Sequence, residues 1–293
     1  MAKLSKPQPE RINHPYLTAI KRTALSAPTR YLLQEGLLVG RILDFGCGYG
    51  FDTDDLARQG FDIEGYDYYW RPDYPDGTFD TIICNYVLNV LEPYAQAEVL
   101  MNVASLLKPK GNAYFAVRRD LTEVGFRLHA IHKEYTYQCN VQLPYKSLVS
   151  NTGFELYQYN HFNQLPRQEG VRCPFCNLAR RVKIICESAT CVAFLDGYPV
   201  SPGHTLIIPK RHVASYFDLT HHEREAMNVM AQYVKQKLDE TYHPDGYNIG
   251  INVGKAAGQS VFHCHMHIIP RYKGDVDNPK GGVRGVIPAK QKY

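Results

Sequence analysis

Hydrophobic positions in the first half of the chain follow two patterns that alternate. Short apolar runs at 41–45 and 79–85 have the length and composition of buried strands. The stretch 92–107 places apolar residues on one helical face, and 29–38 reads as another helix after Pro28. Alternating strands and helices predict a mostly parallel sheet covered by helices.

Two further features complete this sheet. The segment 107–111 predicts a turn into a strand at 112–117. The tyrosine-dense segment 134–160 has strand-like alternation and predicts the final antiparallel strands of the same sheet. We therefore expect an α/β Rossmann-like domain in this half.

Strand patterns dominate the second half. One helix is predicted there, from a capping box at Thr220 and Glu223 to about Glu240, because Thr and Glu at this spacing satisfy helix-start donors reciprocally. The other elements are an apparent hairpin and three further strands, at 183–187, 190–195, 203–209, 247–253 and 259–269. This pattern predicts an α+β domain with an antiparallel sheet.

The polar segment 163–172 separates the two patterns. We set the boundary there and expect one domain at 1–170 and a second at 171–293. A chain of 293 residues suits two domains that each bury a core.

Composition adds the expected compartment. No run of 18 apolar residues occurs, so no membrane span is expected, and the polar start of the chain lacks the apolar core of a signal peptide. We expect a cytoplasmic protein, in which the eight cysteines are reduced thiols or metal ligands. The net charge of +4, with its positive excess in the second half, would attract an anionic nucleotide but is too small to indicate duplex nucleic-acid binding.

The first candidate site is a glycine-dense turn that follows the strand at 41–45. Glycines in such a turn let the backbone approach a ligand at a helix N-terminus, as in nucleotide-binding α/β folds. Acidic Asp67 ends the next strand, where it can accept hydrogen bonds from ribose hydroxyls. The residues of the turn and of the strand ends are Asp44, Gly46, Gly48, Gly50, Asp67 and Asn85.

This series resembles the class I S-adenosylmethionine-dependent methyltransferases, on the motifs at 43–50, 79–83 and 107–111. The resemblance implies that the glycine turn lies against the methionine part of the cofactor, that Asp67 binds its ribose and that Asn85 contributes to the same site. The segments 21–28 and 85–91 are similar to putative methyltransferases found beside DNA phosphorothioation systems. The methyl acceptor is not implied.

One segment departs from this family. Only 11 residues separate Asp67 from Phe79, which is too short for the helix and third strand that usually follow. Either Trp70 and its neighbours replace the adenine pocket, or cofactor binding has weakened. A methyltransferase-shaped domain without activity is the alternative to a working enzyme.

The second candidate site is a run of histidines at alternate positions, His263, His265 and His267. Alternate residues of a strand share a face, so the three imidazoles are expected to lie together, with Phe262, Cys264, Met266 and Ile268 facing the core. Imidazoles suit phosphate chemistry, because a neutral ring can be a nucleophile or a metal ligand and a protonated ring can bind phosphate.

These residues and the segments 201–212 and 252–261 resemble the histidine triad (HIT) family of nucleotide hydrolases and transferases. The resemblance implies that His265 attacks the α-phosphorus of a nucleotide, while His204, His267 and Ser260 act on the phosphate. It also implies a nucleotide-binding set of Asp196, Leu195, Asn252 and Gln259. His rather than Gln at 267 favours the hydrolase branch.

Cys173 and Cys176 form a Cys-x-x-Cys pair, which alone fits either zinc or a redox dithiol. The HIT resemblance implies a structural Zn²⁺ held by Cys173, Cys176, His212 and His263. It also suggests a homodimer in which two sheets join edge to edge.

Three hypotheses for the whole chain follow. The first is a bifunctional enzyme with S-adenosylmethionine in one half and a nucleotide substrate in the other. The second is that only the HIT half is catalytic and the first half binds a ligand or partner. The third is a nucleotide sensor without turnover, which the intact His204, His265 and His267 argue against.

Overall fold

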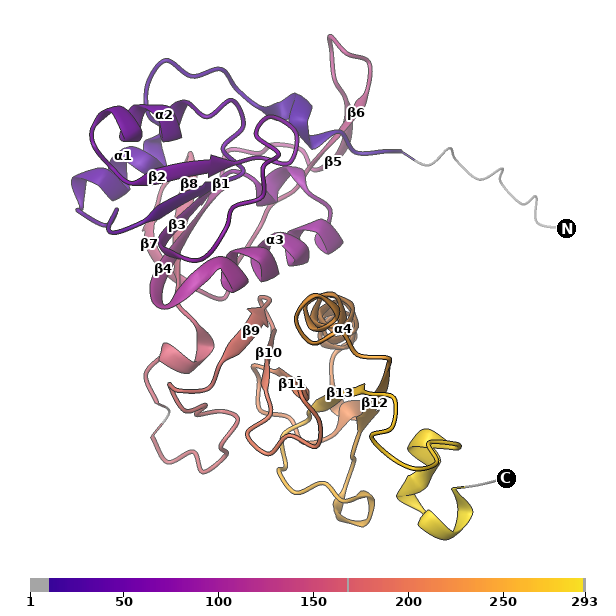
Figure 1. Cartoon of the computed structure of the whole chain (residues 1–293). Coiled ribbons are helices and arrows are strands. Elements are labelled where there is room, and N and C mark those ends of the chain that lie inside the picture. Colours follow the sequence, from indigo (N-terminus) through magenta and orange to yellow (C-terminus); the bar gives the residue numbers. More distant parts are fainter. Residues whose placement is uncertain (1–10, 168, 292–293) are drawn as a thin grey trace, which may run out of the picture. The chain divides into compact units, whose positions relative to one another are not determined.

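The computed structural model describes residues 11–167 and 169–291 (Figure 1). Contacts divide the chain into two compact units, each described here by itself. Unit 1 runs up to Gln96 and continues over Gly111–Tyr159, and unit 2 comprises Ala97–Lys110 with the chain from Asn160 onward. Within the described ranges, no helix combines the length and the apolar character that crossing a membrane requires.

Unit 1 is built on a six-stranded sheet with the order β2-β1-β3-β4-β8-β7. The pairs β1–β2 and β1–β3 are parallel, and the pairs β4–β8 and β8–β7 are antiparallel, which agrees with a Rossmann-like methyltransferase sheet. The strands are β1 (Ile42–Phe45), β2 (Ile63–Tyr66), β3 (Phe79–Asn85), β4 (Leu107–Arg118), β7 (Lys146–Ser150) and β8 (Phe154–Tyr159), and the helices are α1 (Ala27–Gln34) and α2 (Phe51–Arg58). Helix α3 (Pro93–Leu106), which precedes β4, belongs mainly to unit 2.

The sheet of unit 1 ends at β2. No further strand pairs with the outer edge of β2 anywhere in the described parts of the chain. This agrees with the short segment after Asp67, which leaves no room for a helix and another strand.

Two expectations for unit 1 were wrong. The segment 107–111 is not a turn, because α3 passes directly into β4 at Leu107. The tyrosine-dense segment does not join the main sheet throughout: β6 (Tyr135–Gln138) pairs with β5 (Gly125–Leu128) in a separate hairpin. The chain near Asn13 occupies the other edge of β6, since the Tyr137 N–H donates to Asn13 Oδ1 and the His14 N–H donates to Tyr135 O.

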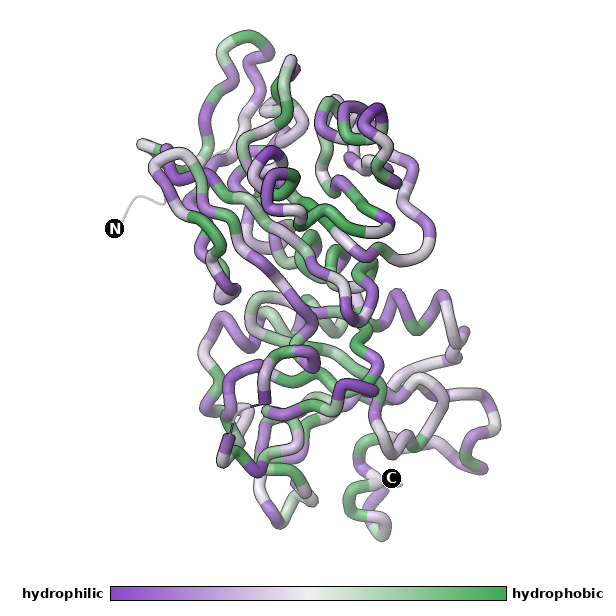
Figure 2. The backbone as a smooth tube through the Cα atoms, turned by 90° about the vertical axis from the view of Figure 1, so that its left-hand side faces the viewer, coloured by the Kyte–Doolittle hydropathy of each residue, from purple (hydrophilic) through white to green (hydrophobic). Residues whose placement is uncertain are grey.

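Unit 2 holds an antiparallel five-stranded sheet with the order β12-β13-β11-β10-β9 and one long helix, α4 (His221–Tyr242), which contacts β9, β10, β11 and β13 (Figure 1). The strands are β9 (Ile184–Glu187), β10 (Cys191–Leu195), β11 (Thr205–Pro209), β12 (Gly246–Ile251) and β13 (Met266–Arg271). The capping box of Thr220 and Glu223 is confirmed at the start of α4. The buried stripe of Met227, Met230, Val234 and Leu238 packs into the core beneath the sheet. Figure 2 shows short hydrophobic stretches that alternate with hydrophilic ones along the backbone.

Short 3₁₀ turns connect these elements. They are η1 (Pro15–Thr18), η2 (Leu88–Val90), η3 (Phe162–Gln164), η4 (Tyr216–Asp218), η5 (Lys255–Ala257), η6 (Gly282–Val286) and η7 (Pro288–Lys290).

The histidine run is only partly a strand. β13 begins at Met266, so His263 and His265 lie in the segment before it, and Phe262 is 44% exposed rather than in the core. The expected burial of Cys264, Met266 and Ile268 is confirmed. The Gln259 side chain interrupts the expected strand, because its amide binds Gly254 N, Ala214 O and Val261 O and fixes a loop there.

A buried ion pair braces β9. Glu187 is 1% exposed; Lys210 Nζ lies 2.9 Å from one carboxylate oxygen and His161 Nδ1 lies 3.1 Å from the other. Burial alone would raise the pKa of Glu187, but Lys210, His161 and the Phe162 N–H lower it from 4.5 to about 2. A carboxyl whose pKa is lowered by folding adds stability above its unfolded pKa and loses it as the pH falls towards the folded pKa.

Glu187→Gln is therefore expected to lower the free energy of unfolding at pH 7 by roughly 3 kcal/mol. The wild type should lose this contribution between pH 4.5 and about 2, whereas the variant should lack that part of the pH dependence. Urea unfolding across this pH range measures both effects. Glu225→Gln, at a side chain that is 60% exposed, is the control. If the free energy of unfolding has the same pH dependence in Glu187→Gln and in the wild type, Glu187 does not provide this stabilisation.

Candidate active sites

Three imidazoles meet near the first residues of β11 and β13 in unit 2. His204 precedes β11, His267 lies in β13, and their Nε2 and Nδ1 atoms are 3.0 Å apart. The ring of His265 lies 5.0 Å from that of His267. β11 and β13 are paired neighbours, which places two of the three rings side by side.

The hydrogen bonds define the proton positions on His265. Its Nδ1 lies 2.7 Å from His263 O, and a carbonyl oxygen can only accept. Nδ1 therefore carries the proton, and in the neutral ring the lone pair sits on Nε2. His265 is 4% exposed, so this nitrogen is largely shielded from water.

The same reasoning extends through the other two rings. His204 Nδ1 lies 3.3 Å from the Val200 N–H and 3.4 Å from Asp196 Oδ2, and only the Val200 contact has hydrogen-bond geometry. We therefore assign the proton of neutral His204 to Nε2, which in that tautomer donates to His267 Nδ1. His267 Nε2 then carries a proton; it is buried and has no partner among the described residues. Burial, together with His265 and His204, lowers the pKa of His267 to about 4, so the ring is neutral at pH 7. The site thus offers one lone pair and one unpaired N–H side by side.

A cavity of about 500 Å³ adjoins His204. Its wall includes Asp196, whose Oδ1 accepts from the Tyr198 N–H at 2.9 Å and whose Oδ2 lies 3.4 Å from His204 Nδ1. Apolar and small residues form the rest, namely Leu195, Pro199, Val200, Ser201, Pro202, Gly203 and Tyr242. The predicted nucleotide residues Leu195 and Asp196 are therefore brought together beside the histidines.

The other predicted residues of this site lie in the loop after β12. Asn252 is half-buried just beyond the strand, and Ser260 is exposed. Gln259 is 5% exposed and its amide is occupied by backbone groups, so in this structure it shapes the loop. The sequence analysis missed Phe175, whose ring centroid lies 5.3 Å from that of His265 in an edge-to-face arrangement. Its position between the two cysteines was the available signal.

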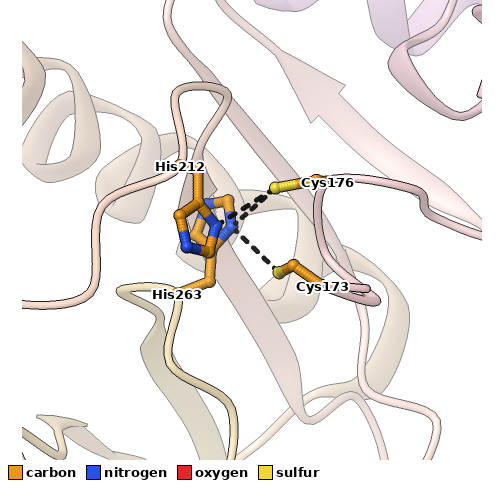
Figure 3. Close-up of side chains that lie close together, drawn as sticks. All are labelled: Cys173, Cys176, His212 and His263. Atoms are coloured by element: carbon orange, nitrogen blue, oxygen red, sulfur yellow. Dashed lines mark hydrogen bonds between the residues drawn. The ribbon is translucent and has the colours of Figure 1, made fainter. Parts of the chain in front are cut away.

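Figure 3 shows the second cluster of unit 2, in which Cys173, Cys176, His212 and His263 converge from three segments. His263 Nε2 lies 2.8 Å from Pro209 O and therefore donates, which leaves the Nδ1 lone pair directed at the sulfurs. The sulfur–nitrogen distances are 3.2 Å (Cys176 to His212) and 3.5 Å (each cysteine to His263). Tetrahedral Zn²⁺ bonds to sulfur and nitrogen imply about 3.6 Å between such atoms. The donor set and spacing fit zinc.

The glycine turn of unit 1 follows β1. Gly46, Gly48 and Gly50 have φ angles of 79°, 55° and 82°, which side-chain-bearing residues rarely adopt. A Cβ on Gly46 would lie 2.2 Å from a methyl of Val87. Asp44 lies beneath the turn, 3% exposed, and accepts from Thr53 Oγ1 at 2.9 Å. Burial, followed by the charge of Asp52, raises the pKa of Asp44 to about 7.

Asn85 ends β3 beside this turn. Its Nδ2 donates to Thr29 Oγ1 at 2.9 Å, and Thr29 donates to Asp52 at 2.7 Å. Its Oδ1 is buried and has no partner in the described part of the chain. An unpaired buried acceptor costs about 1–3 kcal/mol, so a ligand donor at this point would stabilise the site. Thr29 and Asp52 were not predicted, because their contact depends on how α1 and α2 pack.

Asp67 joins the loop after β2 to the glycine turn. One carboxylate oxygen accepts from the Gly48 N–H at 3.0 Å, and the other accepts from the N–H groups of Tyr69 and Trp70 at 3.0 and 2.9 Å. The structure therefore brings together the predicted set of Asp44, the three glycines, Asp67 and Asn85 at the carboxyl ends of β1, β2 and β3, where open α/β sheets bind ligands.

The first sheet and its glycine turn define a Rossmann-like α/β domain. The second sheet and its three histidines define an α+β domain with a histidine triad. Comparisons with known proteins agree. A methyltransferase-domain family model matches residues 17–167, and a HIT-domain model matches residues 179–274. The chain belongs to the methyltransferase-domain family through its first half and to the HIT family through its second.

Three similar proteins all match the HIT half. An uncharacterised HIT-like protein of Mycoplasma genitalium is 39% identical over 34% of this chain and 74% of its own length. The bis(5'-adenosyl)-triphosphatase of Dictyostelium discoideum is 40% identical over 34% of this chain and 68% of its own. A crystal structure of a zinc-bound histidine triad protein from Mycobacterium smegmatis is 37% identical, with a TM-score of 0.33, over 36% of this chain and 78% of that one. The similarity to methyltransferases of phosphorothioation systems stays a prediction.

Proposed function

We propose that the HIT half hydrolyses nucleoside polyphosphates or phosphoramidates through a nucleotidyl-histidine intermediate. The observation that carries this proposal is the pairing of a lone pair on His265 Nε2 with an unpartnered N–H on His267. The lone pair on His265 lets it act as a nucleophile. The N–H of His267 can stabilise the negative charge that grows on the phosphate oxygens during the reaction.

The proposed reaction has two steps. His265 Nε2 attacks the α-phosphorus, and a nitrogen–phosphorus bond forms as the bond from phosphorus to the leaving group breaks. A phosphate leaves as its anion, and an amine leaves after taking a proton from solvent. Water then attacks the same phosphorus, the nitrogen–phosphorus bond breaks, a water proton passes to solvent, and the nucleoside monophosphate is released with His265 restored. His267 donates to a phosphate oxygen in both steps, and His204 holds His267 in the donating tautomer. In this scheme Ser260 and Asn252 act on the phosphate and leaving group from the loop after β12.

The cavity beside His204 is the proposed nucleoside site. Asp196 offers carboxylate oxygens to the ribose hydroxyls, and Leu195 with Val200 provides apolar surface for the remainder. The Dictyostelium relative is named for a dinucleoside triphosphate, which supports a substrate of this class.

The test is a substrate panel. The full-length protein is incubated with diadenosine triphosphate, diadenosine tetraphosphate and an adenosine phosphoramidate, and products are separated by chromatography. We expect adenosine monophosphate as a product of at least one compound. Absence of turnover on all three would favour the sensor hypothesis.

In unit 2, Cys173, Cys176, His212 and His263 would hold Zn²⁺. A closed site with four protein ligands supplies folding energy rather than chemistry. We assign His263 to this role and not to catalysis, because its Nε2 is bound to Pro209 O and its Nδ1 faces the sulfurs.

We further propose that unit 1 binds S-adenosylmethionine and transfers its methyl group to an acceptor. The cofactor supplies an electrophilic methyl group when bound. The residues that fit it are the glycines of the turn, which adopt positive φ angles, the buried Asp44 and Asn85 with its unpaired Oδ1.

Cofactor affinity should depend on the ionisation of Asp44. Because its pKa is raised to about 7, the carboxylate that attracts the cofactor's ammonium group forms only as the pH rises through neutrality. The affinity for S-adenosylhomocysteine is expected to increase roughly eightfold between pH 6 and 7.5. Titration calorimetry measures this. The Asp44→Asn variant should bind S-adenosylhomocysteine weakly, with an affinity that does not change with pH. If the affinity of the wild type does not change with pH, Asp44 is not the group that attracts the ammonium.

We also propose a homodimer through the HIT half. β12 is an edge strand of its sheet, and Ile249 on it is 53% exposed. Exposed apolar edge strands favour pairing with another chain. Ile249→Asp should convert a dimer to a monomer in sedimentation experiments, while Val124→Asp, at an exposed residue of unit 1, should not. A monomeric wild type at micromolar concentration would refute this proposal.

A further inference from the structure

The loop after β2 occupies the place of the helix and strand that this sheet lacks. Asp67 and Arg71 close it, because each backbone N–H donates to the other residue's carbonyl oxygen, at 2.9 and 3.0 Å. Inside the loop, Asp67 Oδ1 accepts from Tyr69 and Trp70. The loop is thus a fixed structure rather than an open connection.

This loop folds onto the glycine turn. The ring of Trp70 lies 4.3 Å from that of Tyr49, between Gly48 and Gly50, and the two planes make an angle of 39°. The Arg71 guanidinium donates to Tyr49 O at 3.3 Å and to Asp54 at 2.7 Å. A Cβ on Gly50 would lie 2.0 Å from this guanidinium, so a larger residue there would displace the Arg71 side chain from its contacts with Tyr49 O and Asp54.

Trp70 carries an unused hydrogen-bond donor. Its Nε1 is buried and has no partner among the residues described. A buried indole N–H without an acceptor costs about 1–3 kcal/mol, and tryptophan has no other polar atom with which to compensate. A ligand acceptor beside the ring would recover that free energy.

Asp67 has limited capacity left for a ribose. A carboxylate has about four acceptor positions, and the N–H groups of Gly48, Tyr69 and Trp70 use three of them. One position cannot hold two ribose hydroxyls. Recognition of the nucleoside part therefore needs a further group on this side of the glycine turn.

We propose that Trp70 is the residue that recognises the adenine ring of S-adenosylmethionine in this chain. Its indole contacts the ring, and its Nε1–H donates to a ring nitrogen. Trp70 thereby replaces the pocket that the missing helix and strand would form. This inference rests on the proposed binding of S-adenosylmethionine by unit 1.

The sequence contains a single tryptophan, so the intrinsic tryptophan fluorescence of the full-length protein reports on Trp70 alone. S-adenosylhomocysteine and adenosine, which both carry adenine, are expected to change the emission saturably. L-methionine, which lacks the base, is expected to leave it unchanged. The dissociation constants from fluorescence should agree with those from calorimetry.

Two substitutions separate the parts of the contact. Trp70→Phe keeps an aromatic ring and removes the N–H, and we expect about tenfold weaker binding of S-adenosylhomocysteine, the equivalent of one hydrogen bond. Trp70→Ala removes both and should weaken binding about a hundredfold. Tyr68→Ala is the matched control, because Tyr68 is in the same loop but 88% exposed. The affinity of this variant for S-adenosylhomocysteine should equal that of the wild type. Unchanged thermal unfolding of Trp70→Phe shows that the loop remains folded.

Each outcome decides between the proposals. If calorimetry shows binding of S-adenosylhomocysteine while the emission of Trp70 is unchanged and Trp70→Ala binds equally well, the adenine assignment is wrong and cofactor binding stands. If the wild type does not bind S-adenosylhomocysteine at all, both are wrong, and the first half recognises a different ligand.

Discussion

His265→Ala is expected to reduce the release of nucleoside monophosphate at least about 10³-fold. The substitution removes the only imidazole lone pair of the described triad that is not already an acceptor. The lone pair on His204 Nδ1 accepts from the Val200 N–H, and the lone pair on His267 Nδ1 accepts from His204 Nε2. Binding of the substrate should persist, since the cavity beside His204 is unchanged. Steady-state kinetics with the preferred compound of the panel measures the loss in kcat.

The matched control is His221→Ala. This histidine lies in the first turn of α4, its side chain is 81% exposed, and its ring contacts Glu225. Activity of this variant should equal that of the wild type. A His265→Ala variant that retains more than a tenth of wild-type kcat would remove His265 from the role of nucleophile.

Cys176→Ala is expected to abolish zinc binding and to lower the unfolding temperature by more than about 10 °C. The four ligands tie together three segments of unit 2, so loss of the ion releases all three. Hydrolase activity should fall as well, because His263 supplies the carbonyl oxygen that orients His265. Elemental analysis of the purified protein should find one zinc per chain in the wild type.

Cys139→Ser provides the matched control for zinc, since Cys139 is a free cysteine of unit 1, where it contacts Gln96. Its zinc content should remain one per chain. Chelation of the wild type should reproduce the unfolding temperature of Cys176→Ala. A wild type that contains no zinc and unfolds at the same temperature as Cys176→Ala would show that the cluster is a set of reduced thiols and imidazoles.

Local sequence rules predicted much of this architecture. Three predicted features depend on residues close in sequence, and the structure agrees with all three. They are the capping box at Thr220, the strand before the glycine turn and, among the described residues, the absence of a further strand after Asp67. The HIT resemblance also grouped Cys173, Cys176, His212 and His263, which the fold brings within reach of one ion. The spacing of these motifs predicts the cluster because the fold always brings the same segments of the chain together.

Features that depend on long-range contacts were missed. The start of β13 at Met266 follows from the Gln259 amide, which binds backbone groups as far away as Ala214. The separation of β6 from the main sheet depends on the N-terminal segment at Asn13. Proton positions on the triad likewise depend on the carbonyl of His263 and the N–H of Val200. Side-chain and backbone contacts of this kind leave no periodic pattern in the sequence.

The measurement that tests the account most directly is the mass of the covalent intermediate. The protein is mixed with its substrate, quenched in base, where a histidine–phosphorus bond survives, and digested for mass spectrometry. We predict a nucleoside monophosphate adduct on His265, absent from His265→Ala. Consumption of the substrate without an adduct at His265, or with one on another residue, would contradict the proposed mechanism.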